Sequence, residues 1–427
     1  MGADEKQFAS KSGARFWRLG LIFVAGSLWL NLLIFIDFGE GIKRGYPDFT
    51  VLYTAGTILR EGRGHELYNS RVQYQVQQDF SGHIAFRGGA LPYIHPPFEA
   101  PLFVPLTWLP YTRAFAVWDL LNVAMLFGVG LLLRQSVACL RSVQPWKFAL
   151  GSLTFFPVFA CLLEGQDSIL MLLLCALAFN ALKRKADFLA GCWLALAAFK
   201  FQFIVPIVLL LVLWKRRRAA IGFGAVATVL ALLSVSLVGV KALLQYPGYV
   251  RQVVASPSLG GVPPELLPNL HGLAMGWHGP FSGTFGVALA VLSSMLLIVF
   301  AVQKGLESAH QEKLELLFSL AIVVSVLVAW QTNSHDLSLL VIPLVLVTDY
   351  SLHLRTQKRA VRFALLFPVL PLLLGPLWLV LWLVSAKVNL IAILLLYWAW
   401  MIGKEIPRDR GSADFGLPQP HWVGVSE

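Results

Sequence analysis

Apolar stretches of about twenty residues recur from one end of the chain to the other, with short polar segments between them. A helix of that length matches the hydrocarbon thickness of a bilayer. The pattern predicts an all-α polytopic membrane protein with about twelve crossings. The predicted spans are 19–38, 113–134, 147–163, 167–182, 187–200, 201–214, 218–240, 281–302, 315–331, 337–348, 362–383 and 388–402. The short spans 201–214 and 337–348 are expected to be bent or to line a cavity rather than lipid.

Longer polar segments mark the loops between the predicted spans. We expect residues 39–112 to form a large first extracytoplasmic loop with interfacial helices, and residues 241–280 to form a second one. Prolines recur along 96–110, and because proline removes backbone donors and bends helices, this stretch is predicted to lie at the interface rather than to cross. Residues 1–402 are predicted to form a single membrane domain, followed by a cytoplasmic tail at 403–427.

The composition and charge of the chain support this prediction. Of the 427 residues, 57% are hydrophobic and only 13% are charged, whereas soluble domains carry about a quarter charged residues. The net charge of +11 comes from basic clusters between the apolar runs, which indicates cytoplasmic anchors rather than nucleic-acid binding. Both termini are then cytoplasmic. The basic segments are Arg134–Lys147, Lys183–Lys185, Lys215–Arg218, Lys304–Lys313, His353–Arg362 and the tail with Lys404, Arg408 and Arg410.

The sequence lacks the motifs of several common enzyme classes. It has no zincin motif, no phosphate-binding glycine loop, no dinucleotide fingerprint and no nucleophile elbow. Its four cysteines have no metal-ligand spacing, so we expect small packing residues. No metal or other cofactor is predicted, although a divalent cation remains compatible with the sequence.

Polar residues away from the basic clusters gather on the predicted outer side of the membrane. Charged groups near hydrocarbon are costly and usually functional, so five segments that supply them at one depth predict a shared site. These segments hold Asp48, Glu164 to Asp167, Lys200 with Gln202, Asn269 with His271, and Ser334 to Asp336.

Each of these residues also has a plain structural explanation. Asp48 precedes a helix-like run and could cap its free N–H groups. Lys200 could extend from a helix end to the headgroups, although the orientation rule disfavours a lysine on this side. His335 could be held by local hydrogen bonds, and Gln166 or Asn269 could join neighbouring helices.

The ordered segments resemble glycosyltransferase family 87, a group of membrane-embedded GT-C enzymes that includes polyprenol-phosphate-mannose-dependent mannosyltransferases. The resemblance runs nearly the whole length. It rests on DFTVLYTAGTILREGRGHELY, YIHPPFEAPLFVPLTWLPYTRAFAVWDLLN, EGQDSILMLLL, LALAAFKFQFIVPIVLLLVLWKRRR and NSHDLSLLVIPL. The chain departs from the family pattern at Phe201, where the family usually has proline, and at His95, where it usually has tyrosine before Pro-Pro.

The resemblance implies a GT-C type helix bundle and a role for several residues. Asp48 matches the catalytic acid, and Lys200 and His335 match polar positions of the lipid-phosphate donor pocket. The resemblance also places Gln166, Gln202 and Asn269 in elements of the family pattern. Apart from the resemblance, we expect His271 and Asp336, from the outer polar segments, and Arg63, with Arg60 as an alternative cation for the phosphate, to bind substrate.

These expectations combine into one functional hypothesis. A membrane hexosyltransferase, most readily a mannosyltransferase of the cell envelope, would move the sugar from a polyprenyl-phosphate donor to an extracytoplasmic acceptor with inversion. Its partners are the lipid donor, the bilayer and an acceptor that could be a glycolipid, a glycan or a protein, and it would lie in the plasma (inner) membrane. Trp108 and Trp118 are candidate walls of a groove for the lipid tail. The alternative is a transporter or flippase of lipid-linked sugars, which needs polar groups across the bilayer centre.

Overall fold

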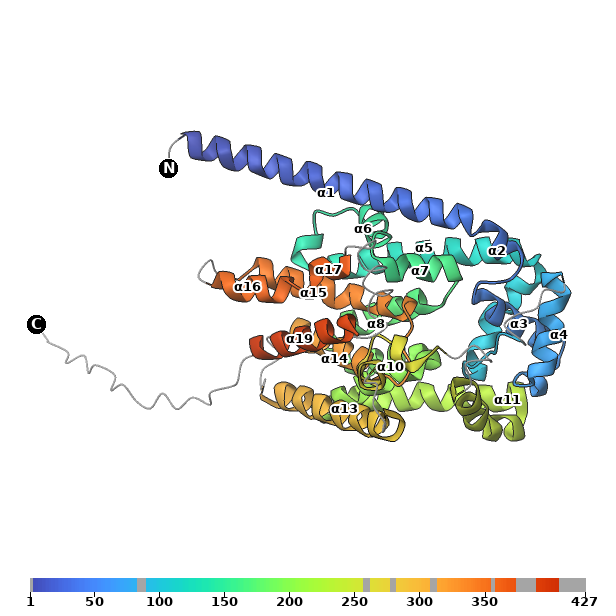
Figure 1. The fold of residues 1–427 in the computed structure, drawn as a ribbon. Helices are drawn as coiled ribbons and strands as arrows, with labels where there is room; N and C mark the ends of the chain where they lie inside the picture. The colour runs from blue at the N-terminus through green and yellow to red at the C-terminus, as the bar shows by residue number, and fades with distance from the viewer. Residues whose placement is uncertain are drawn as a thin grey trace, which may run out of the picture.

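The computed structural model describes residues 3–82, 90–255, 262–276, 282–307, 313–354, 358–373 and 389–406, with side chains from residue 20 onward. Every regular element in these ranges is a helix. The tail from 407 and part of the predicted span 362–383 lie outside the described residues. Figure 1 shows a bundle of roughly parallel and antiparallel helices, with α1 running along its outside.

The helices follow the chain in this order. The first part holds α1 (Ala3–Asp37), α2 (Gly39–Lys43), α3 (Phe49–Arg60), η1 (Gly64–Glu66), α4 (Ser70–Ser81), η2 (Pro97–Trp108), α5 (Tyr111–Ser136), η3 (Ala138–Leu140), α6 (Pro145–Ser152), α7 (Phe156–Glu164) and α8 (Ser168–Lys183). The second part holds α9 (Asp187–Leu196), η4 (Ala197–Lys200), α10 (Phe201–Leu213), α11 (Arg217–Ala255), η6 (Pro264–Leu266), α12 (Leu270–Met275), α13 (Ser282–Glu307), α14 (Leu314–Val328), η7 (His335–Leu340), α15 (Val341–Leu352), α16 (Arg359–Leu366), α17 (Val369–Leu373) and α19 (Leu390–Glu405).

Six helical stretches of the described chain are long and apolar enough to cross a membrane, or seven if the bent pair α6–α7 counts as one. They are Gly20–Asp37, Tyr111–Ser136, Asp187–Leu213, Arg217–Val254, Gly283–Glu307 and His335–Leu352. The apolar helices α8 and α14 are shorter. The chain is therefore an all-α membrane protein, and the total of about twelve crossings stays a prediction.

Two predicted spans differ in shape from straight helices. The span predicted at 147–163 is bent by 84° between α6 and α7. The stretch Asp187–Leu213 is continuous, but Arg216, just beyond its end, lies 2.9 Å from Asp187 at its start. A straight helix of this length would extend about 40 Å, so the chain reverses direction inside the stretch. The 3-10 turn η4, where the predicted spans 187–200 and 201–214 meet, separates its two arms.

The predicted outer loops hold more helix than the hydropathy pattern suggests. α11 continues to Ala255 after a break at Gly239, whose φ is 80°. Of the predicted loop 241–280, residues 241–255 are therefore helical, as are η6 and α12 further on. The proline-rich stretch forms the 3-10 helix η2. It is not among the stretches that could cross, and it packs against α3.

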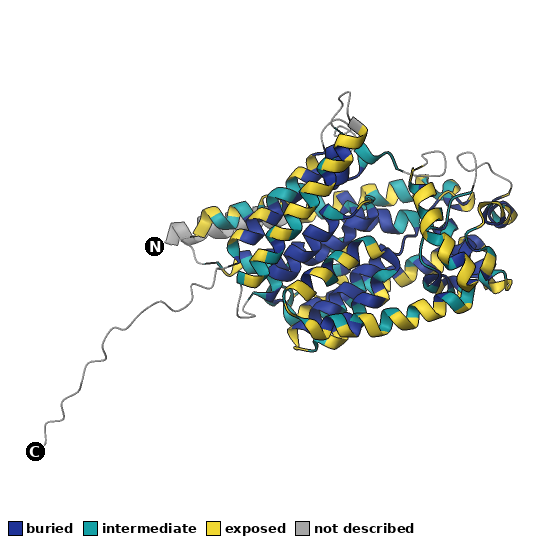
Figure 2. Cartoon of the chain, turned by 90° about the horizontal axis from the view of Figure 1, so that it is seen from below, coloured by how far each residue is buried: buried dark blue, intermediate teal, exposed yellow. Residues whose placement is uncertain are grey.

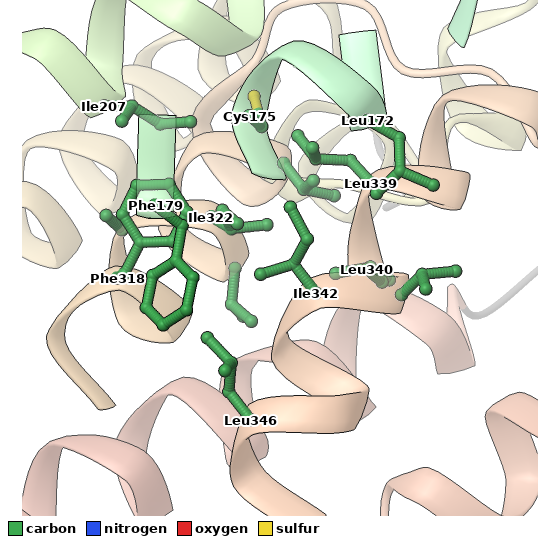
Figure 3. Packing of buried hydrophobic residues seen from close by; sticks show 14 of the residues in the cluster. Leu172, Cys175, Phe179, Ile207, Phe318, Ile322, Leu339, Leu340, Ile342 and Leu346 are labelled. Carbon is green, nitrogen blue, oxygen red and sulfur yellow. The ribbon is translucent and has the colours of Figure 1, made fainter. Parts of the chain in front are cut away.

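Burial separates inner from outer helices. The apolar residues of α8, α14 and α15 surround each helix instead of forming one stripe, and such helices are buried in a core. Their side chains interlock around Phe179, Phe318 and Ile342 (Figure 3). By contrast, α1, α11 and α13 expose large apolar residues such as Trp29. In Figure 2 the outer helices therefore show many exposed residues, in yellow, and the inner helices are mostly buried, in dark blue. The outer faces are those expected to contact lipid.

The basic segments meet at one end of the bundle. Arg184 donates to Gln135 at 2.7 Å and the Cys139 amide to Asp349 at 2.7 Å. Further contacts are Lys183 with Glu315, Arg216 with Asp187, Lys313 with Tyr350 and Tyr350 with Glu405. In Figure 1 the start of α1 and the end of α19 lie toward this end, whereas α2, α3 and α4 lie at the other. The sequence predicts this arrangement, in which the basic segments and both ends of the chain share one side of the bundle.

Candidate active site

A cavity of about 300 Å³ lies at the end of the bundle opposite the basic segments, and we call it the polar cavity. Its lining brings together six of the nine residues that the sequence singled out. The polar side chains that line it are Asp48, His95, Gln166, Lys200, Gln202, Gln331, Asn333, His335 and Asp336. Residues far apart in the sequence thus converge on one site.

Asp48 occupies the N-cap position of α3, yet its side chain makes no capping hydrogen bond. Its Oδ2 instead accepts a hydrogen bond of 2.8 Å from Gln166 Nε2. Glu164 and His335 are close to it: one ligand atom from each of the three residues lies within 4.8 Å of the other two. Asp48 therefore does not cap α3, and its carboxylate lies at the cavity instead.

Gly165 sets the position of the Gln166 side chain. It ends α7 in the left-handed conformation, with φ of 60°, where glycine carries no steric penalty. A Cβ at this position would lie 2.7 Å from Phe49 Cβ and 2.8 Å from a Phe115 ring carbon. The Gly165 carbonyl also accepts a hydrogen bond of 2.9 Å from Trp118 Nε1. The tight turn therefore places Gln166 beside Asp48.

Lys200 lies at the end of η4, where the chain reverses. Its Nζ is 2.9 Å from Asp167 Oδ1 and 2.6 Å from Asp336 Oδ1, and it donates to Ser168 Oγ at 2.8 Å. The lysine is buried. A buried cation needs such partners because desolvation is costly, and two carboxylates already share its charge.

His335 is buried and faces two acids. Its Nδ1 lies 2.6 Å from Glu164 Oε2, and its Nε2 lies 3.6 Å from Asp336 Oδ1. Asp336 also accepts a hydrogen bond of 2.8 Å from the backbone N–H of Asn333. These contacts hold the imidazole ring at the wall of the polar cavity.

A second buried cluster borders the same cavity. His95 Nδ1 lies 2.7 Å from Glu99 Oε2 and 3.0 Å from Asp167 Oδ2. Because Asp167 also pairs with Lys200, an alternating row of charges connects Glu99 with Asp336. The sequence prediction left out both His95 and Glu99, although a histidine and a glutamate four residues apart after a tyrosine were visible in the sequence.

The pKa values of the groups in the first outer loop shift for identifiable reasons. Burial raises the pKa of Asp48, and the negative Glu164 raises it further, while His335, Gln166 and Lys200 act to lower it. Burial would lower the pKa of His95, but the neighbouring Glu99 and Asp167 outweigh it and raise that pKa to about 10. His95 is therefore a cation at neutral pH.

Three predicted site residues do not line the polar cavity. Arg63 pairs with Glu66 at 2.7 Å and with Glu61 at 3.3 Å. Asn269 caps α12, donating to Ala329 O at 2.8 Å and accepting from Gly272. His271 stacks on Trp330 with ring centroids 3.9 Å apart and lines the neighbouring groove described next.

A larger cavity of about 830 Å³ adjoins the polar cavity, and we call it the apolar groove. The two share lining residues, among them Phe201, Val254 and Trp330. The rest of its lining is Tyr246, Pro247, Val250, Arg251, Ala255, Val262, Pro264, Leu267, His271 and Gln331. The predicted groove walls Trp108 and Trp118 line neither cavity: Trp108 is 72% exposed and Trp118 is buried.

Two groups of side chains have ligand types that suit a metal ion: Asp48 with Glu164 and His335, and His95 with Glu99 and Asp167. In both groups the histidine Nδ1 lies 2.6 to 2.7 Å from a glutamate oxygen. These are hydrogen-bond lengths, so the imidazole and carboxylate groups satisfy each other. In each group the histidine and the glutamate therefore already contact each other directly.

Comparison with known proteins gives one match. Residues 93–330, more than half of the chain, match glycosyltransferase family 87. The match confirms the family expected from the sequence. No curated protein and no solved structure matches the chain. Asp48, His335 and Asp336 lie outside the matched residues.

Proposed function

The chain belongs to glycosyltransferase family 87 and is a membrane glycosyltransferase; we propose that it moves a hexose, most readily mannose, from a polyprenyl-phosphate donor to an extracytoplasmic acceptor with inversion. One observation carries this proposal. The Asp48 carboxylate does not cap α3, and it faces the polar cavity beside the apolar groove. A base for an alcohol, cations for a phosphate and a space for a lipid tail are then adjacent.

The proposed reaction uses Asp48 as general base. The acceptor hydroxyl gives its proton to the Asp48 carboxylate as its oxygen bonds to the anomeric carbon of the donor sugar. The bond between that carbon and the phosphate oxygen breaks, and its electron pair leaves on the phosphate. Because the acceptor attacks opposite the leaving group, the anomeric configuration inverts. A raised pKa suits Asp48 to this task, since a carboxylate of higher pKa is a stronger base.

The leaving polyprenyl phosphate gains negative charge during the reaction and needs cations near it. Lys200 and His335 line the polar cavity and are held in place by acids. A cation fixed before the reaction stabilises developing charge without further reorganisation. We assign these two residues to the phosphate, and Gln166 to orienting Asp48. Gln202, which also lines the cavity, is assigned to substrate binding.

The apolar groove is the proposed site of the lipid tail. Its wall is formed mainly by apolar residues of α11 and of the segment 262–271, with Arg251 and His271 at its polar points. An isoprenoid chain gains free energy from burial there, because apolar area leaves water. This position replaces the one expected beside Trp108 and Trp118.

The same arguments orient the enzyme in its membrane. The basic end of the bundle would face the cytoplasm together with both termini, which places the polar cavity on the extracytoplasmic face. We assign the protein to the plasma (inner) membrane for this reason. The acceptor would reach Asp48 from that side as a glycolipid, a glycan or a protein.

A donor panel tests the proposal. The purified protein in detergent is incubated with polyprenyl-phosphate hexoses and lipid extracts, and released polyprenyl phosphate and glycosylated product are measured. We expect both to form, most rapidly with the mannosyl donor. If no donor releases polyprenyl phosphate in detergent while sealed vesicles translocate a lipid-linked sugar, the transporter alternative replaces this function.

A further inference from the structure

His95 directly precedes Pro96 and Pro97, and the structure places it in the wall of the polar cavity. It lies between Tyr93, whose ring is stacked at a centroid distance of 5.7 Å, and the start of η2. Tyr68 donates a hydrogen bond of 2.9 Å to the His95 backbone carbonyl. Its position is therefore set by packing and by backbone contacts.

One edge of the His95 ring is fully used by acids. Glu99 and Asp167 both approach Nδ1, at 2.7 and 3.0 Å, and their side chains are only 1% and 0% exposed. Two buried carboxylates beside one nitrogen favour a proton on it, because the proton offsets both desolvated charges. The raised pKa of His95 has this cause. The ring is held as an imidazolium.

The other edge of the ring remains available. An imidazolium donates from both nitrogens, and among the described residues none forms a hydrogen bond or ion pair with Nε2. The His95 side chain is 16% exposed and lines the polar cavity. Because Nδ1 is turned toward the acids, the N–H at Nε2 lies on the other side of the ring, and the cavity that His95 lines can supply an acceptor for it.

The charges around Lys200 explain why a further cation is useful. Lys200 already faces Asp167 and Asp336, at 2.9 and 2.6 Å. His95 shares Asp167 with it, which leaves more of the lysine charge uncompensated toward the cavity. Asp48, which lines the cavity, and Glu164, which lies close to Asp48 and His335, add two further acids. Without His95 the site would hold one cation fewer beside these acids, and it would attract a phosphate less strongly.

We propose that His95 is a substrate-binding cation of this chain, which donates its Nε2–H to the phosphate group of the lipid donor. The inference rests on the proposed function and adds a binding residue to it. The donor phosphodiester carries one negative charge and the departing monoester carries two. The contact therefore strengthens as the reaction proceeds, so His95 contributes to the rate as well as to donor affinity.

The test is inhibition by polyprenyl monophosphate in His95→Gln, which keeps a polar side chain and removes the charge. A hydrogen bond to a charged group contributes enough that we expect the inhibition constant to rise about ten- to a hundredfold. The kcat for transfer should fall along with kcat/KM. His65→Gln is the matched control, because His65 is exposed on η1 in the same outer loop, and its constants should equal the wild-type values.

A double variant distinguishes phosphate binding by His95 from a role in which His95 only neutralises the buried acids. Burial raises the pKa of Glu99 to about 8, so the double variant His95→Gln with Glu99→Gln is compared with the wild type at pH 9. At this pH the two substitutions remove one cation and one acid together and the buried cluster keeps its net charge; thermal melting checks the fold. If His95 only neutralises the buried acids, this double variant recovers wild-type inhibition and the proposal is overturned. We expect the inhibition to stay weak, because the donor group at Nε2 is still missing.

The outcomes also distinguish this inference from the proposed function. If the wild-type enzyme transfers sugar from a polyprenyl-phosphate donor and His95→Gln keeps its inhibition constant within about twofold, only the role of His95 fails. If the wild-type enzyme neither transfers sugar from these donors nor binds polyprenyl monophosphate, the proposed function itself fails.

Discussion

The two ends of the helix bundle hold the same kinds of charged residues and use them differently. At the basic end, ion pairs join partners that keep some exposure, such as Arg216 with Asp187, at 12 and 19%, and Lys304 with Glu307, at 15 and 29%. At the opposite end, Lys200, Asp167 and Asp336 are at most 5% exposed, and Lys200 and Asp336 line a cavity. A half-exposed pair contributes little to stability, whereas a buried set of charges is costly unless every partner is present. This difference agrees with the proposal that the basic end orients the protein and the cavity end holds the reaction.

The backbone shows the same contrast. At the basic end, left-handed φ values of 60° and 64° occur at Lys185 and Lys215, which carry exposed side chains. At the cavity end the equivalent turn uses Gly165, where a Cβ would collide with Phe49. A left-handed φ is tolerated at Lys185 and Lys215, because their side chains have space. At Gly165 glycine is required, because the chain packs closely against Phe49.

The largest expected effect comes from removing the proposed base. Asp48→Asn should lower the rate of sugar transfer by about 10²- to 10⁴-fold, which is what a general base contributes. The fold should survive, because the Asp48 side chain makes no capping bond and asparagine is a good N-cap residue. Transfer assays and thermal melting measure the two effects. Asp187→Asn, at the basic end, should leave the rate unchanged; equal loss in both variants would contradict the contrast between the ends.

A lysine substitution at each end compares burial directly. Lys200→Gln leaves Asp167 and Asp336 as buried carboxylates without their shared cation, so we expect a loss of about 3–5 kcal/mol in unfolding free energy. Lys304→Gln breaks a half-buried pair with Glu307 and should cost about 0–1 kcal/mol. Chemical or thermal unfolding in detergent gives both values. Similar losses of unfolding free energy would mean that the buried charges at the cavity end matter no more for stability than the ion pairs at the basic end.

The two left-handed turns provide a third comparison. Gly165→Ala adds a Cβ at a φ of 60° and against Phe49, and the two effects together should destabilise the protein by about 2–4 kcal/mol. Lys215→Gly removes a side chain from a strained conformation and should stabilise it by at most about 1 kcal/mol. Melting curves of the two variants should move in opposite directions. Transfer should weaken only in Gly165→Ala, because its turn positions Gln166.

The smallest expected effect concerns pH. Since Asp48 acts as a base in its deprotonated form, kcat/KM falls as the pH drops through its pKa, which burial and Glu164 raise above the usual 3.8. Glu164→Gln removes a negative neighbour and so lowers that pKa, while His335 and Lys200 continue to lower it. The acid limb of the pH profile should therefore move down by on the order of one pH unit. An acid limb that stays in place or moves to higher pH in Glu164→Gln would contradict the proposed roles of Asp48 and Glu164.

Several parts of the site were predictable from the sequence for a clear reason. Asp48, Gln166, Lys200 and His335 are polar residues beside apolar spans on the side away from the basic clusters. Hydropathy and charge depend only on local composition, so they place such residues at a depth in the membrane. The structure then brings these four together at one cavity.

Other parts could not be predicted, because they depend on contacts between distant segments. Arg63 has the right charge and lies in the right loop, but its own neighbours Glu61 and Glu66 bind it. Trp108 and Trp118 suggested a lipid groove, and only packing shows that one is exposed and the other is buried. The proposed role of His95 depends on its contacts with acids on η2 and beside α8.

The sequence by itself determined that this chain is an all-helical membrane protein, which loops share one end of it and to which family it belongs, because these follow from runs of residue types along the chain. Only the tertiary structure decided that Asp48 bonds to Gln166 instead of capping α3, that Lys200 sits between two acids, and that His95 keeps one nitrogen free of described partners. The physical reason is that burial and charge pairing are properties of packed helices, and side chains more than a hundred residues apart supply them together.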